Sequence, residues 1–443
     1  MHPPHRIVPL LRRTLLALAV TGVLVGLDAP SRADDGAPPD PRDRLLAARA
    51  ARVDRNTATR HITPEGVLAY VHRPDATPDQ LSEDIVREWD TGIWTGAYAA
   101  AMACRWHVTK SPEALLICQR LATGLDLLSR ATGVEGCLSR SVGRLPPGAD
   151  AGSGIVASPL GGSLHYRNDP SRDTLAGMTL GWWFLYKYVR DPEVQAYAVR
   201  NLGAIARRLW AGKMQVRDAD GRITKYGALE AKTALIFENG PYAAIGLATI
   251  LAGKAASPCP ELDVAWAKLR EDGWPSALDS QYTWLGGRIT SASNMNMVHM
   301  ALLVLATVDE PRVRENTERA LRAFRDRSRG WQNGGYLAMG LLCGMGLDRA
   351  DMVEELRQTL IDMPPGEQAL NDGQRDGGAI VPIWMRPNDT WQWKIDSSQV
   401  PANPGRAVPD PKHTYTRADW AFAYWLARAA GTLDPGPEAT TSK

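Results

Sequence analysis

The chain has 443 residues, of which 44% are hydrophobic and 23% are charged, a balance that is ordinary for a soluble globular protein. Its 51 basic and 49 acidic residues leave a formal net charge of +2 without a basic cluster, so nothing favours a nucleic-acid partner. Fifteen tryptophans stand against four phenylalanines. A flat indole stacks on sugar rings, so this excess favours a carbohydrate ligand, although large helical cores also use tryptophan to fill space.

The first 33 residues have the pattern of a signal peptide. Arg6, Arg12 and Arg13 form a basic region, residues 15–27 form a short apolar run, and small residues end the segment. The apolar run is too short to span a bilayer. We therefore expect an exported, periplasmic or extracellular protein without stable membrane insertion after cleavage, by either the general or the twin-arginine route.

The next segments lead into the folded domain. Residues 34–43 are rich in Pro and Asp and are expected to form a linker. Residues 44–55 have one apolar face, which predicts a helix. Residues 57–79 contain three prolines and no periodic pattern, so a loop over the surface is expected there.

From residue 89 onward, the sequence repeats a pair of helices five times. The first helix of each pair is densely apolar, as a helix buried on both sides must be, and the second has a charged outer face. Several second helices start with Pro after a turn, as at Ser111-Pro112 and Asp191-Pro192. The first helices are expected at residues 89–108, 173–190, 239–252, 294–307 and 333–345, and the second at 112–131, 194–210, 261–271, 312–327 and 350–363.

The two ends of the domain supply a sixth pair. A last helix, at residues 417–430, resembles the first members, and the helix at residues 44–55 supplies its partner. Twelve helices in six pairs predict an all-α fold, a single (α/α)6 toroid over residues 44–432, with a disordered tail at 433–443. An open solenoid is the alternative, but solenoids keep a constant repeat length and these pairs do not.

The long links between pairs all fall at one end of such a toroid. They cover residues 132–172, 211–238, 272–293 and 364–416. Long loops in compact domains are usually functional. The same end presents the amino ends of the apolar helices, whose free N–H groups favour anions and hydroxyl oxygens. We therefore expect a cleft there.

The signal peptide, the alternating helices and the Trp-rich loops resemble the (α/α)6-toroid carbohydrate-active enzymes: glycoside hydrolases, polysaccharide lyases and sugar epimerases. The resemblance covers residues 44–430 and is architectural, because no family-defining motif is present. It implies an oligo- or polysaccharide substrate bound in a cleft at one end. It implies no catalytic residue, and no metal or cofactor is expected.

Three acidic residues, Asp90, Asp173 and Glu238, precede or open successive apolar helices and are the candidate catalytic residues. A glycoside hydrolase needs two carboxyl groups, roughly 5–10 Å apart across the scissile bond. Acids at neighbouring helix starts suit that separation, so hydrolysis is the preferred function. The alternative for Asp90 and Asp173 is helix N-capping, whereas Glu is a poor cap.

Further residues are candidates for binding the substrate. His165 and Tyr166 lie in a long link and His299 in an apolar helix, and such residues favour a second function, a polysaccharide lyase or epimerase acting on a uronate-containing glycan. His299 has an alternative as a core histidine. A non-catalytic glycan-binding envelope protein is the third function. The complete set of binding candidates is Trp94, His165, Tyr166, Asn239, His299, Arg386, Trp391, Trp393 and Asp396.

The candidates in the last long link are aromatic and charged. Trp391 and Trp393 are expected to stack on sugars, with Arg386 and Asp396 hydrogen-bonding hydroxyls. The alternative is that the tryptophans fill the apolar rim of the domain.

Two smaller patterns complete the reading. The segment from Asp218 to Gly221 lacks the ligands of a calcium loop and is expected to be the turn of a β-hairpin. Cys104 and Cys118 are nearly equidistant from the turn at residue 111, so either a disulfide or two buried thiols is compatible with an antiparallel helix pair. The five cysteines show no metal-ligand spacing.

Overall fold

The computed structural model describes a mostly helical chain. The described residues are 40–69, 71–88, 90–229, 240–283, 292–329, 333–344, 349–362, 375–376, 379–380 and 414–435. They contain fourteen α-helices and a few short strands, so the all-α class is confirmed. The predicted signal peptide and the start of the linker lie outside the described residues, as does most of the tail.

Six helices are densely apolar and are called the apolar helices below. They are α3 (Thr91–Thr109), α5 (Arg172–Tyr188), α7 (Gly240–Ala256), α10 (Ala292–Thr307), α12 (Gly334–Leu342) and α14 (Ala418–Ala429). Each contacts the next in chain order, α14 contacts α3, and α5 also contacts α10 directly. The core of the molecule therefore lies between these six helices.

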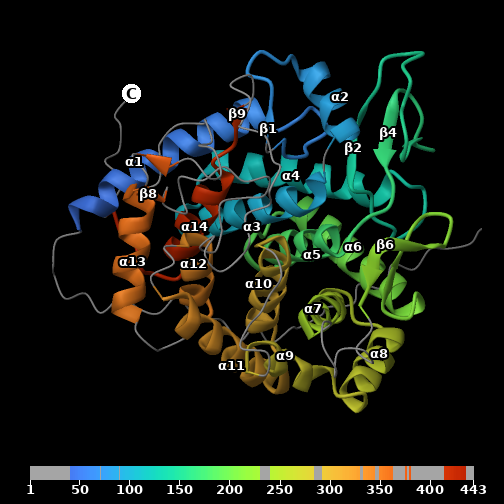
Figure 1. The fold of residues 1–443 in the computed structure, drawn as a ribbon. Helices are drawn as coiled ribbons and strands as arrows, with labels where there is room; N and C mark the ends of the chain where they lie inside the picture. The colour runs from blue at the N-terminus through green and yellow to red at the C-terminus, as the bar shows by residue number, and fades with distance from the viewer. Residues whose placement is uncertain are drawn as a thin grey trace, which may run out of the picture.

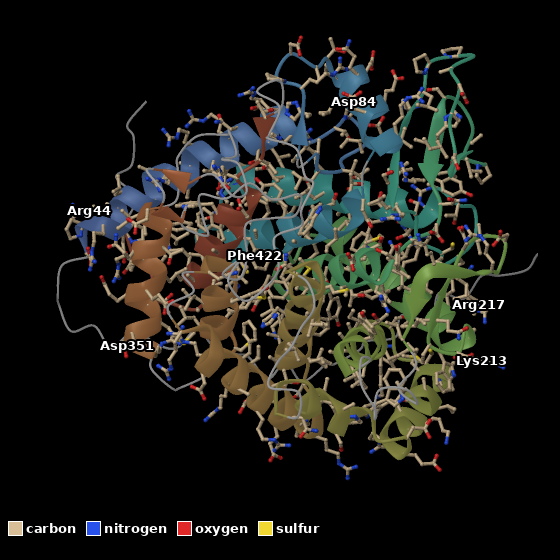
Figure 2. The ribbon with its side chains drawn as sticks, in the orientation of Figure 1. Arg44, Asp84, Lys213, Arg217, Asp351 and Phe422 are labelled. Carbon is tan, nitrogen blue, oxygen red and sulfur yellow. The ribbon has the colours of Figure 1, made fainter. Side chains whose placement is uncertain are left out.

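Each apolar helix contacts a more polar helix that is its neighbour in the chain or, for α14, the first helix; α5, α7 and α12 contact a second such helix as well. The partner helices are α1 (Pro41–Asn56), α4 (Pro112–Arg130), α6 (Pro192–Ala211), α8 (Pro260–Glu271), α11 (Pro311–Ser328) and α13 (Arg349–Asp362). Five of the six begin with Pro, whose missing N–H costs nothing in the first turn of a helix. Figure 2 shows charged side chains such as Arg44 and Asp351 at the periphery and Phe422 of α14 in the interior.

The two ends of the domain pack together. Helix α1 contacts both α13 and α14, and Figure 1 shows the three side by side. Arg357 of α13 donates a hydrogen bond to Asp43 of α1 at 2.8 Å, and the Asp43 carboxylate also accepts from the main-chain N–H of Asp434 at 2.9 Å. The predicted pairing of the first and last helices is thus present.

Helices α3 and α5 approach each other more closely than side chains would allow. A Cβ atom on Gly96 would lie 1.8 Å from the carbonyl oxygen of Gly177, and one on Gly177 would lie 2.3 Å from Cα of Ile93. Only glycine permits this backbone contact. The contact brings the starts of α3 and α5 together, and the candidate site lies there.

The segment expected to be a surface loop, residues 57–79, is largely buried up to residue 72, so that expectation was wrong there, whereas residues 73–79 are mostly exposed. It contains a π-helical turn η1 (Thr57–His61) and leads into α2 (Pro78–Glu88). Val67, Leu68 and Ala69 are fully buried, and the Leu68 N–H donates to Thr95 Oγ1 of α3 at 2.9 Å. An extended segment packed on a helix has no helical periodicity, which explains why the pattern gave no signal.

The long links also contain regular structure. Helix α9 (Trp274–Thr283) packs against α7 and α11. The three-stranded sheet β2-β4-β3 precedes α5, with β2 (Ser141–Arg144), β3 (Ile155–Ala157) and β4 (Leu164–Arg167) all antiparallel.

Three two-stranded pairs complete the strands, and one confirms a prediction. The Asp-Gly turn predicted near residue 220 joins β5 (Gln215–Arg217) to β6 (Ile223–Ala228). The others pair β1 (Val71–His72) with β9 (Thr414–Tyr415), and β7 (Arg375–Asp376) with β8 (Ala379–Ile380).

Candidate functional site

The start of α3 is capped by a main-chain carbonyl rather than by a side chain. The Arg140 carbonyl oxygen accepts hydrogen bonds from the N–H groups of Thr91 at 2.9 Å and Gly92 at 3.1 Å. These are two of the N–H groups that a helix leaves without an internal partner. Asp90 holds the N-cap position but its side chain makes no cap hydrogen bond. The carboxylate of Asp90 is therefore released for other contacts.

That carboxylate binds the start of the neighbouring helix. Thr174 Oγ1 donates to Asp90 at 3.0 Å and Ser171 Oγ donates at 3.2 Å, and Arg140 Nη2 forms a salt bridge at 3.1 Å. Ser171 and Thr174 also form the capping box of α5, each hydroxyl accepting from the other residue's main-chain N–H. Both hydroxyls thus accept from amides and direct their protons to Asp90, whose side chain is 17% exposed.

Asp173 lies in the first turn of α5, between the two residues that bind Asp90. It is half-buried, and Ser171, not Asp173, is the N-cap of α5. Two of the predicted acids thus stand at the starts of neighbouring helices. Neither one caps its own helix through its side chain, so capping does not account for them.

The sheet beside this cluster carries two more of the predicted residues. On β4, His165 and Arg167 share one face, and Leu164 and Tyr166 occupy the buried face. The half-buried His165 donates its Nδ1–H to the carbonyl of Ser163 at 2.8 Å. Burial, followed by the nearby charge of Asp218, raises the pKa of Tyr166. Of the two predicted residues on β4, His165 lies on the same face as Arg167 and Tyr166 lies on the opposite, buried face.

Three arginines surround the start of α5. Arg140 pairs with Asp90, while Arg167 donates to the main-chain carbonyl of Arg87 at the end of α2. Burial, followed by the adjacent charge of Arg140, lowers the pKa of Arg167, while the charge of Asp90 opposes this shift. On the other side, the guanidinium of Arg172 lies 3.6 Å from the ring centroid of Tyr242.

The link between β4 and α5 is fixed by the β5–β6 hairpin. Asp169, which has a left-handed backbone with φ of 60°, donates its N–H to Asp218 Oδ2 at 3.1 Å. Its carboxylate accepts from the N–H of Lys225 at 3.0 Å and from Arg222 at 3.1 Å. This clamp holds the residues that lead into Ser171, and so it fixes where α5 begins.

The remaining described candidates are buried in the core. Trp94 is 3% exposed in α3. His299 of α10 is 1% exposed and stacks on Tyr336 at 4.2 Å between ring centroids, with Phe324 at 4.0 Å. Both side chains are therefore buried among core residues, and neither presents an exposed surface to a glycan. Glu238, Asn239, Arg386, Trp391, Trp393 and Asp396 lie outside the described residues.

The sequence analysis missed Arg140, Ser171 and Thr174. Ser171 is a preferred N-cap residue type and so gave a readable signal for the start of α5, whereas Thr174 replaces the Glu or Gln of the usual capping-box pattern and gave none. Arg140 had none, because its role depends on a main-chain carbonyl placed by the β2 strand.

The cysteines are all described, and all five are free thiols. Burial raises the pKa of the Cys104 and Cys118 thiols, and the two lie on neighbouring helices without a bond between them. Among the residues that the structure describes, no group of three or more His, Cys, Asp or Glu side chains is arranged to hold a metal ion.

No protein-family model matches the chain, and a search of curated proteins gives no match. No helix in the described ranges is both long enough and apolar enough to cross a membrane.

Proposed function

We propose that the chain is an exported glycoside hydrolase whose glycan binds at the end of the domain where α3 and α5 begin. The observation that supports this most is the release of Asp90 from capping by the Arg140 carbonyl. A carboxylate freed in this way stands beside a second acid, Asp173, at the start of the adjoining helix. Paired carboxyl groups are what glycoside hydrolysis requires.

The proposed architecture is an (α/α)6 toroid. Its support is the succession of contacts among the six apolar helices, which runs in chain order and returns from α14 to α3, together with one partner helix for each. The contact between α5 and α10 narrows the middle of such a ring. Export belongs to the proposal through the signal-like residues 1–33.

We assign the two acids different roles. Asp90 has Arg140 as its counter-ion and two hydroxyl donors, an environment that suits the base or nucleophile. Asp173 is then the general acid that protonates the leaving oxygen. Glu238 is the third acid to test for either role.

The test is a screen of glycans for enzyme-dependent release of reducing ends, followed by variants on the best substrate. Asp90→Asn and Asp173→Asn are expected to lower kcat by about 100-fold or more, the usual contribution of an acid or base. Asp309→Asn is the matched control, because this acid is 88% exposed in the turn between α10 and α11. If Asp90→Asn, Asp173→Asn and Glu238→Gln each keep full turnover, the hydrolase proposal is overturned.

A lyase or epimerase acting on a uronate-containing glycan is the second candidate. The observation that favours it is the shared face of His165 and Arg167 on β4, which places a base beside a cation. Release of new ends together with an unsaturated-uronate absorbance identifies a lyase, and a changed uronate composition by NMR identifies an epimerase. Binding without any of these products identifies a non-catalytic glycan-binding protein.

A further inference from the structure

Two buried hydrogen-bond donors, on Arg140 and on its chain neighbour Ser141, have no acceptor among the described residues. Ser141 Oγ is fully buried, and no residue in the described part of the chain bonds to it. The Nε–H of Arg140, the preceding residue, is also buried without a partner. Buried donors without acceptors are rare in folded proteins and call for an explanation such as a water, an ion or a ligand.

Arg167 adds further donors on the same side of the sheet. Ser141 and Arg167 are direct partners in the antiparallel β2–β4 register, so their side chains share a face. Within the described ranges, the one hydrogen bond that Arg167 donates from its side chain goes to the Arg87 carbonyl, and it forms no salt bridge. Its Nε and Nη2 atoms remain available.

The charges of this group do not cancel. Arg140 and Arg167 bring two positive charges, whereas Asp90, which interacts with both, brings one negative charge. The group is reachable at one edge, where the side chains of Arg140 and Asp90 are 27% and 17% exposed, and Ser141 forms its buried end. A ligand that fits it must supply several acceptor oxygens and a negative charge.

A carboxylate meets these requirements better than a sugar hydroxyl. Its two oxygens offer about four acceptor sites, and its planar shape matches the fork of a guanidinium. A hydroxyl brings no charge, and it offers fewer acceptor sites than a carboxylate.

We propose that Arg140, Ser141 and Arg167 form a subsite that binds the carboxylate of an acidic sugar. This inference rests on the proposed glycan-binding function and names its substrate class: glycans that carry uronate units. Ser141 and Arg167 donate to the carboxylate oxygens, and Arg140 holds Asp90 at the edge of the subsite.

The experiment is isothermal titration calorimetry with oligosaccharides of galacturonate, glucuronate and mannuronate. Each is compared with its carboxyl-reduced counterpart, which has the same chain and linkage without the charge. Sulfated galactan oligosaccharides form a third arm, which separates carboxylate from sulfate recognition. We expect at least one uronate series to bind about tenfold or more tightly than its reduced form, because charge-assisted hydrogen bonds are the strong ones.

Variants then locate the preference. Arg167→Gln is expected to remove most of the difference between acidic and reduced ligands and to leave binding of the reduced form unchanged. Ser141→Ala is expected to weaken acidic ligands about threefold to tenfold, the usual effect of one hydrogen bond. It also loses no native bond, so a purely structural serine would leave affinity unchanged. Arg52→Gln is the control, because Arg52 is an exposed arginine on α1, away from β2 and β4 in the chain.

Each outcome decides between the two proposals. Equal affinity for acidic and reduced ligands, a preference for sulfate alone, or an acid preference that survives in Arg167→Gln overturns the subsite while the glycan-binding function stands. Failure of every acidic and neutral glycan to bind overturns the proposed function, and the subsite with it.

Discussion

Two aspartate–arginine pairs lie at helix contacts of α3, and their surroundings differ. Asp54 of α1 lies 3.4 Å from Arg105 of α3, with its side chain 1% exposed. Its Oδ2 also accepts from Trp425 Nε1 of α14 at 3.0 Å, while Oδ1 has no partner. Asp90 is partly exposed and has Arg140 and two hydroxyls around it.

The comparison separates a pair that packs helices from a pair that faces a ligand site. Burial raises the pKa of Asp54 to about 7, because Arg105 and Trp425 do not replace the water that the carboxylate loses. The contribution of the buried pair to stability therefore depends on pH. The pair at Asp90 lies beside hydrogen-bond donors without acceptors and is partly exposed, which suits the binding of a ligand.

The largest expected effect comes from breaking the buried pair. Arg105→Met leaves Asp54 buried without its counter-ion, and such changes cost about 3–5 kcal/mol. We expect that loss in the free energy of unfolding, measured by urea denaturation at pH 8. Arg319→Met, at an exposed position on α11, should change stability by less than about 0.5 kcal/mol. A loss below about 1 kcal/mol for Arg105→Met would show that the buried pair is no different from a surface pair.

The second prediction concerns pH. The pKa of Asp54 rises from 3.8 to about 7 on folding, so between about pH 4 and pH 7 the folded state binds more protons than the unfolded state. This group therefore makes stability fall as pH rises through that range, by a few kcal/mol in order of magnitude. Asp54→Asn should remove that contribution, so the variant gains on the wild type between pH 5 and pH 8. A pH-independent difference between the two proteins would contradict the assignment.

Sequence patterns predicted the helices well and the polar contacts poorly. Pro112 and Pro192 fix helix starts locally, so boundaries followed within a few residues. In the sequence, Asp54 looks like an ordinary exposed acid on the polar side of α1. The residues that bury it come from α3 and α14, which are distant in the chain. Asp90 likewise meets Ser171 and Thr174, more than 80 residues later in the chain. Local periodicity carries no information on such pairings.

The third prediction is a smaller loss at the ligand-facing pair. Arg140→Gln removes the salt bridge to Asp90 but keeps the main-chain carbonyl that caps α3. Because this pair is partly exposed, we expect a loss of about 1 kcal/mol or less in urea denaturation. A loss as large as that of Arg105→Met would erase the distinction between the two pairs.

The fourth prediction is an effect of similar size from the loss of one hydroxyl. Thr174→Val removes a donor to Asp90 and half of the capping box of α5, at nearly constant volume. Such caps and hydrogen bonds contribute about 0.5–1.5 kcal/mol. Thermal unfolding should show a small fall in Tm, whereas Thr123→Val on the exposed face of α4 should show none. An unchanged Tm in Thr174→Val would mean that Asp90 does not depend on this hydroxyl.

The bond between Asp54 and Trp425 also sets an order of events during synthesis. The two residues are 371 positions apart, so Asp54 of α1 can form this bond only after Trp425 of α14 has been synthesised. At 5–20 residues per second, that interval is roughly 20–75 s. Throughout that interval, the surface of α1 that packs on α14 is uncovered, so this part of the core forms only after α14 has been synthesised.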